Sequence, residues 1–145
     1  MFENAPDPAL VAQMLRSVSG AQGFNAWLGL ELLSVETGRV EIAFALGRGE
    51  LTQHHGTTHG GIIATAADIV CAWAAASVAG DVVTGGFSIQ FLSPAQGSRL
   101  RAVGEVLKAG KRQVTVEAKV YADPEGGPPK LVAVALGSIS PVARG

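Results

Sequence analysis

Residues 53–68 read QHHGTTHGGIIATAAD, a polar loop rich in histidine and glycine that leads into an apolar segment. From residue 62 to residue 79 nearly every side chain is apolar or small, and Asp68 is the only charged one. A helix that is apolar on all sides has to be covered on all sides. We therefore expect residues 62–79 to form the central helix of the fold, with Asp68 buried within it.

A carboxylate in such a helix calls for an explanation. Ionising a buried acid costs free energy unless a partner or a bound water compensates. Perturbed acids of this kind cluster at functional sites. We take Asp68 as a candidate functional group; the alternative is a carboxylate that caps or pairs structurally across a subunit interface.

The size and composition of the chain indicate a self-associating protein. Its 145 residues suffice for one domain, expected over residues 1–145, whose core needs neither disulfide nor metal. Hydrophobic residues make up 48% and charged residues 16%, which is more apolar surface than a small monomer easily hides. We expect a dimer or tetramer.

The charge balance argues against two classes of partner. The net charge is −1, with acids and bases interspersed, so the sequence predicts binding neither to nucleic acid nor to a membrane. The long apolar segment carries a charge near its middle, which favours a core helix over a membrane span. Cys71 is the only cysteine, which is typical of a reducing compartment, and no export signal is apparent, so we expect a cytoplasmic location.

The remaining elements follow from the spacing of apolar residues and from residues that begin or end helices and turns. Asp7-Pro8 is a typical helix start, Thr37-Gly38 separates two alternating segments, and Gly80 suits a left-handed helix end. The predicted elements are a helix over residues 8–20, a helical turn over 23–27, a hairpin over 30–35 and 40–46, the long helix over 62–79, and strands over 82–92, 99–108, 113–121 and 131–139. For Phe24, Trp27 and Leu28, packing in the core is favoured over lining a ligand pocket.

One apolar helix followed by four strands predicts an α+β fold. A curved antiparallel sheet wrapped around the long central helix would cover that helix. This is the hotdog architecture. Two such subunits can join their sheets edge to edge, which removes an exposed strand edge.

Several polar and glycine residues occur in a recognisable order along this fold. They are Gln53, His59-Gly60-Gly61, Asp68 nine positions after the histidine, Thr84 at the start of the next strand, and Phe91-Leu92-Ser93-Pro94 at its end. With this set, and over nearly its whole length, the chain resembles the hotdog-fold acyl-CoA thioesterases of the PaaI-like, 4-hydroxybenzoyl-CoA thioesterase family.

Thioester hydrolysis requires a polarised carbonyl and a nucleophile. Backbone N–H groups at a helix start are unpaired donors, and Gly60 has no side chain to keep a carbonyl away, so Gly60 is the expected oxyanion donor. The resemblance implies that Gln53 lies beside the same carbonyl and that Asp68 acts as general base or as nucleophile. It also implies that Thr84 holds the water or the carboxylate, and that His59 orients the loop or assists the departing sulfur.

Family members carry asparagine or glutamine at the position of Gln53 and aspartate or glutamate at that of Asp68, so this pairing leaves the choice between base and nucleophile open. Further candidates for substrate binding are Gly61, Ser93 and the basic hairpin residues Lys108, Lys111 and Arg112. This basic cluster could hold coenzyme A phosphates or could be an ordinary solvated turn.

The spacing of two candidates predicts where the site lies. Gly60 and Asp68 are about 12 Å apart along one helix, whereas groups acting on one carbonyl lie within roughly 3–4 Å of it. We therefore expect a site at a subunit interface, with Gln53 and Gly60 from one chain and Asp68 and Thr84 from its neighbour.

Two other chemistries are less consistent with the residues. His54, His55 and His59 invite a metal site, but no Cys or Glu completes a ligand set, so neither a metal nor another cofactor is expected beyond the coenzyme A of the substrate. Cys71 lacks a His or Asn partner and is expected to be a small buried hydrophobe rather than a nucleophile.

The sequence thus predicts a homotetrameric hydrolase that cleaves aryl- or medium-chain acyl-CoA to the free acid and coenzyme A. The alternatives are a non-catalytic acyl-CoA binding or sensing module, which would keep the pocket without hydrolysis, and a hotdog hydratase. A hydratase would need a paired Asp and His or an HFPG-like loop, and neither occurs around His59. The acyl group itself stays open.

Overall fold

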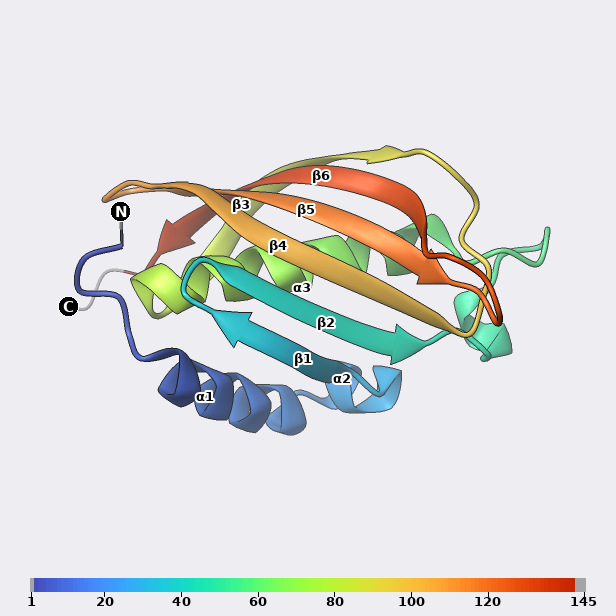
Figure 1. Ribbon diagram of the computed structural model, residues 1–145, viewed down its shortest axis with the longest axis horizontal. Helices are drawn as coiled ribbons and strands as arrows, with labels where there is room; N and C mark the ends of the chain where they lie inside the picture. Colours follow the sequence, from blue (N-terminus) through green and yellow to red (C-terminus); the bar gives the residue numbers. More distant parts are fainter. Residues whose placement is uncertain (1, 143–145) are drawn as a thin grey trace.

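The computed structural model describes residues 2–142 and shows a curved six-stranded sheet over one long helix, with two shorter helices outside (Figure 1). Every predicted helix and strand is present, and one short helix, η1, was not anticipated. The elements are α1 (Pro8–Ala21), α2 (Gly23–Leu28), β1 (Glu31–Glu36), β2 (Arg39–Ala45), η1 (Gly49–Leu51), α3 (Gly60–Ala79), β3 (Val82–Phe91), β4 (Arg99–Ala109), β5 (Val114–Asp123) and β6 (Lys130–Pro141).

The strand order in the sheet is β1-β2-β4-β5-β6-β3, and every neighbouring pair is antiparallel. Strands β3 and β4 follow each other in sequence but are not neighbours, because the segment between them carries the chain from the edge to the middle of the sheet. Within the described residues 2–142, strand β3 therefore pairs with β6 alone and leaves its other edge open. Nearly all of its ten residues are exposed.

Local signals explain where the helices begin and end. The Asp7 side chain accepts a hydrogen bond of 2.7 Å from the N–H of Ala9, and Pro8 occupies the first position of α1. Gly80 ends α3 with φ 79° and ψ −134°. The positive φ agrees with the predicted glycine end, but the ψ angle lies outside the left-handed helical region that the sequence suggested.

Helix α3 lies directly against the sheet at a glycine. A Cβ atom on Gly104 of β4 would lie only 2.4 Å from the carbonyl oxygen of Val70, so no larger residue fits without moving the helix. Gly137 of β6 similarly leaves room for Cys71, whose Sγ would lie 3.0 Å from a Cβ at that position. The sheet side of α3 is thus packed backbone to backbone, and Val70 is fully buried.

The opposite face of α3 is open. Asp68 precedes Val70 by two residues, or about 200° around the helix, and so points away from the sheet. Gly61, Thr65, Asp68 and Ala72 share this side and are all partly or fully exposed. The expectation that one sheet covers α3 on all sides, with Asp68 buried, is therefore wrong for the single chain, in which Asp68 is half-buried.

By length and composition α3 is apolar enough to cross a membrane, but 56% of its most apolar window is buried inside the fold. This burial fits the predicted core helix.

The prediction of core packing for Phe24, Trp27 and Leu28 is wrong for the two aromatic residues. Phe24 and Trp27 are 50% and 45% exposed, and of the three only Leu28 is buried. The two rings stack with centroids 6.0 Å apart, and the Arg48 guanidinium lies over the Trp27 ring.

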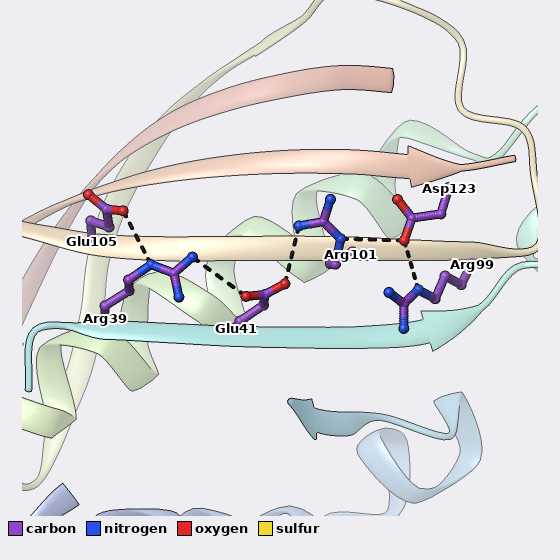
Figure 2. Close-up of polar contacts among 6 residues, drawn as sticks. All are labelled: Arg39, Glu41, Arg99, Arg101, Glu105 and Asp123. Atoms are coloured by element: carbon purple, nitrogen blue, oxygen red, sulfur yellow. Dashed lines mark hydrogen bonds and ion pairs between the residues drawn. The ribbon is translucent and has the colours of Figure 1, made fainter. Parts of the chain in front are cut away.

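The face of the sheet that points away from α3 carries a chain of ion pairs (Figure 2). Arg101 is central, with its Nη1 3.2 Å from Glu41 Oε1 and its Nε 3.4 Å from Asp123 Oδ2. Burial alone would raise the pKa of Asp123, but hydrogen bonds from Arg99 and Arg101, together with their charges, hold it below its usual value. The network joins β2, β4 and β5 through Arg39, Glu41, Arg99, Arg101, Glu105 and Asp123.

Candidate active site

Five of the predicted site residues line two cavities that share no residue. One, of about 370 Å³, lies where α3 begins and is lined by Gln53, Gly60 and Ser93. The other, of about 400 Å³, lies between α1, α3 and the start of β3 and is lined by Asp68 and Thr84. One chain therefore brings Gln53 and Gly60 together, and Asp68 and Thr84 together, but leaves the two pairs in separate cavities.

The N–H groups at the start of α3 differ in what they bind. Gly61 donates to Nδ1 of His59 at 2.9 Å, and the N–H groups of Ile62 and Ile63 donate to the His59 carbonyl. Within residues 2–142 the N–H of Gly60 has no acceptor. Of the first four donors of the helix, it is the one available to a ligand. The ring of Phe91 packs beside it, with Cζ 3.4 Å from where a Cβ would be.

The side chain of Gln53 is held by its own loop. Its Nε2 donates to the hydroxyl of Thr57 and its Oε1 accepts from the N–H of His55, both at 2.5 Å. A carboxamide nitrogen carries two hydrogens, so one donor remains for a ligand in the same cavity. The loop thus fixes the orientation of the amide that borders Gly60.

His59 acts as the N-cap of α3. Because its Nδ1 accepts the hydrogen bond from Gly61, the neutral ring carries its proton on Nε2. His59 thereby holds the loop and the start of α3 in their relative orientation. The same bond occupies the N–H of Gly61, and a Cβ on Gly61 would lie 3.1 Å from that ring nitrogen.

Asp68 and Thr84 are in direct contact. The Thr84 hydroxyl donates to Oδ1 of Asp68 at 2.8 Å. The resemblance implied that Thr84 holds either the water or the carboxylate. Thr84 lies on the edge strand at a register irregularity between Thr84 and Gly86. No residue of the described chain bonds to the second carboxylate oxygen of Asp68, which leaves it open to a water or a substrate.

The basic hairpin lies at the opposite end of the molecule from the start of α3 (Figure 1). Lys108, Lys111 and Arg112 are all exposed around the turn between β4 and β5. In Figure 1 this turn is at the end of the sheet where α3 finishes, whereas α3 begins at the opposite end. Within one chain, the hairpin and the Gly60 cavity are thus far apart.

Sequence reasoning missed the residues that complete the Asp68 cavity. Met14 and Val18 of α1 and Asn25 of α2 line it together with Asp68. A signal was available, because α1 has two apolar stripes. Val11 and Leu15 are buried, while Leu10, Met14 and Val18, spaced four residues apart, are exposed. A helix that packs against the core on one side needs only one apolar stripe, so the second stripe was the signal of another contact.

Cys71 is buried, as predicted, and inert. Burial, followed by the charge of Asp68, raises the pKa of its thiol to about 12, so the nucleophilic thiolate is essentially absent near neutral pH. His54 and His55 lie with ring centroids 4.0 Å apart in the loop. Among residues 2–142 there is no group of three His, Cys, Asp or Glu side chains arranged to hold a metal.

Three comparisons place this geometry among known proteins. Residues 55–128 match the model of the thioesterase superfamily. The chain is 37% identical over 116 residues to a candidate esterase of Saccharolobus solfataricus, covering 77% of this chain and 78% of the relative.

Solved structures share the fold over nearly the full length. A thioesterase family protein of Silicibacter pomeroyi superimposes with a TM-score of 0.84 at 33% identity, over 90% of this chain and 96% of the other. The PaaI protein of the phenylacetic acid degradation operon of E. coli gives 0.83 at 20% identity, over 94% and 96%. At that identity the second likeness supports the fold alone, and it confirms the predicted hotdog architecture.

Proposed function

Because the chain belongs to the thioesterase superfamily and is a thioester hydrolase, we propose that it hydrolyses acyl-CoA thioesters at sites that are each built from two subunits. The observation that carries the proposal is the division of the candidate residues between two cavities. A free N–H suited to polarise a carbonyl lies in one cavity. A carboxylate suited to attack it, or to activate water, lies in the other.

The open edge of β3 supports a pairing that would unite the two halves. Phe91, at the end of β3, packs beside Gly60, whereas Thr84, near its start, bonds to Asp68. When two copies of a strand pair antiparallel, the end of each lies opposite the start of the other. A β3 to β3 pair would therefore bring Gly60 of one subunit toward Asp68 of the second.

This pairing would also cover surface that a single chain leaves exposed. Val83, Phe87 and Phe91 of β3 are 57%, 37% and 46% exposed. An unpaired strand edge of ten residues with apolar side chains is a liability for a monomer. The uncovered face of α3 lies beside this edge, so that one interface would bury both. We place two such dimers in a homotetramer.

In the proposed reaction the Gly60 N–H donates to the thioester oxygen, and the free amide hydrogen of Gln53 adds a second bond. Asp68 then either removes a proton from a water that adds to the carbonyl carbon, or adds itself to form an anhydride that water hydrolyses. In both routes the carbon–sulfur bond breaks, coenzyme A leaves as a thiolate, and the acid is released. Thr84 holds the carboxylate in place.

The outer parts of the substrate would contact the remaining candidates. Ser93 borders the Gly60 cavity at the mouth that the pantetheine arm would cross. The hairpin with Lys108, Lys111 and Arg112 lies at the end of the sheet where β3 begins, and so, in the paired arrangement, near Gly60 of the second subunit (Figure 1). There it could bind coenzyme A phosphates. We assign no metal or further cofactor, and a cytoplasmic location.

The direct test is release of free thiol from a panel of acyl-CoA substrates by the purified protein. Asp68→Asn should lower kcat by about 100-fold or more while the oligomeric state stays the same. Glu117→Gln, which changes a carboxylate on the outer face of the sheet, is the control and should keep normal turnover. Binding of acyl-CoA without thiol release would instead favour an acyl-CoA binding module.

A further inference from the structure

The loop that precedes α3 closes on itself at Gln53 and Thr57. The N–H of Gln53 donates to the carbonyl of Thr57 at 2.8 Å, and the N–H of Gly56 donates to the carbonyl of Gln53 at 2.9 Å. Gly56 has a φ of 82°, a left-handed conformation that glycine adopts without strain. The N–H of His59, where the loop meets α3, donates to the carbonyl of Leu51 at 2.7 Å. The backbone therefore holds Gln53 and Thr57 together at the base of the loop.

The side chain of Gln53 is bound at both polar atoms of its amide, and the two partners differ in kind. The backbone N–H of His55 can only donate, so the atom that it meets at 2.5 Å is the amide oxygen. The nitrogen then faces Thr57, whose hydroxyl accepts one of its two hydrogens. A flipped amide would instead set its NH2 group against the N–H of His55 and present an oxygen to the ligand.

Thr57 is suited to hold this nitrogen in place. The bond between Gln53 and Thr57 is partly buried, whereas the bond to His55 is exposed to solvent. Threonine is branched at Cβ and has few favoured rotamers, so its oxygen lies in a defined direction. Thr57, Gln53 and Gly60 line the same cavity of about 370 Å³. The contact thus fixes the amide of Gln53 inside the cavity that Gly60 borders.

A fixed amide matters for the proposed reaction, on which this inference rests. There the N–H of Gly60 and the amide of Gln53 both donate to one thioester oxygen. Confining a freely rotating glutamine side chain during the reaction costs conformational entropy, and donors that are already oriented avoid this cost. We propose that Thr57 is a positioning residue, whose hydroxyl holds Gln53 with an amide hydrogen rather than the amide oxygen toward the thioester carbonyl.

Steady-state kinetics on one acyl-CoA give the first test. Thr57→Val keeps the shape of the side chain but removes the acceptor, so kcat should fall about five- to tenfold while KM changes less than about twofold. Thr57→Ser keeps the hydroxyl and should restore most of kcat. The matched control is Thr52→Val in the same loop, where the lost hydroxyl bonds to the carbonyl of Gly49 at 2.8 Å, and it should keep normal turnover.

A double-variant comparison shows whether Thr57 acts through Gln53. If it does, Thr57→Val should cause no further loss of kcat in a chain that already carries Gln53→Ala. Losses that multiply in the double variant would overturn the assignment, because Thr57 would then act on the fold or on the substrate by itself.

The polarisation of a bound carbonyl separates this inference from hydrolysis. A ketone analogue of acyl-CoA, with a methylene in place of the sulfur and a 13C-labelled carbonyl, cannot be hydrolysed. Its infrared carbonyl stretch should be lowered on binding, and Thr57→Val should reverse part of that shift while Thr57→Ser and Thr52→Val keep it. A response to Thr57→Val supports the inference even if no thioester is cleaved. An unchanged stretch in Thr57→Val would overturn it even if hydrolysis is confirmed, and failure of the analogue to bind would overturn both proposals.

Discussion

The hydroxyl of Thr84 donates a hydrogen bond of 2.8 Å to the carboxylate of Asp68 and so joins the edge strand β3 to the open face of α3. The two residues are sixteen positions apart and come from different elements. The carboxylate is held in one orientation by a neighbour that is itself anchored in the sheet. Such preorientation is what a group acting on a substrate carbon requires.

Removing this hydrogen bond should slow the reaction without abolishing it. We expect Thr84→Val, which keeps the shape of the side chain, to lower kcat by roughly tenfold because Asp68 loses its fixed orientation. Thr84→Ser keeps the hydroxyl and should retain most of the rate. Steady-state kinetics on one acyl-CoA measure both, and equal rates for the two variants would show that the hydroxyl plays no part.

The N–H of Gly60 can be removed with little change to the helix. Gly60 is the first residue of α3, where proline is favoured, and His59 before it has ψ 135°, which a following proline tolerates. Gly60→Pro should lower kcat by about 100-fold, as loss of one oxyanion donor does. Gly60→Ala retains the N–H and places its Cβ in ordinary contact with Phe91, so a much smaller loss is expected. Comparable losses in both variants would argue for a steric effect instead.

The contact between Gly104 and Val70 should be one of the least tolerant positions of the fold. Gly104→Ala would put a Cβ 2.4 Å from the Val70 carbonyl oxygen, so the free energy of unfolding should fall by about 2–3 kcal/mol as the helix is displaced. Gly47→Ala has nothing within 4 Å and should change it by less than about 0.5 kcal/mol. Urea denaturation of the two variants decides the point, and equal midpoints would contradict the packing described.

The ion-pair network should stabilise the fold in a pH-dependent way. The pKa of Asp123 is lowered from 3.8 in the folded chain, so its contribution is present above that value and is lost as pH falls through the lower folded pKa. At pH 7, Asp123→Asn should reduce the free energy of unfolding by about 1–3 kcal/mol. The difference between the variant and the unmodified protein should shrink below pH 4. A difference that is the same at pH 7 and pH 3 would exclude the linkage.

The fold could be predicted because its signals are local. Asp7-Pro8, Thr37-Gly38 and Gly80 mark ends and turns that the backbone follows. Alternation of apolar residues identified the first two strands, and a high content of β-forming residues between turn signals identified the last four. The position of β3 at the sheet edge is not encoded in such patterns, because strand order depends on contacts between distant segments. Asp68 is half-buried because it lies on the face of α3 that the sheet leaves open, and the apolar sequence around it predicted that this face would be covered.

The candidate site was predictable only where a motif marks it. Gln53, Gly60 and Asp68 stand in a recognisable order, but Asn25 reaches the Asp68 cavity only because α1 and α2 fold back over α3. Phe24 and Trp27 show the reverse case. Their aromatic character indicated core packing, yet α2 is a short helix at the margin of the fold that buries Leu28 instead.

The central claim is that each site combines Gly60 of one subunit with Asp68 of another, and subunit mixing tests it most directly. Gly60→Pro and Asp68→Asn chains, each expected to retain about 1% of the activity or less, are co-expressed in equal amounts and purified together. Random association would give about one quarter of the sites both intact groups, so about one quarter of the unmodified activity should return. Activity no greater than the sum of the two separate variants would contradict a shared site and place the reaction within one chain.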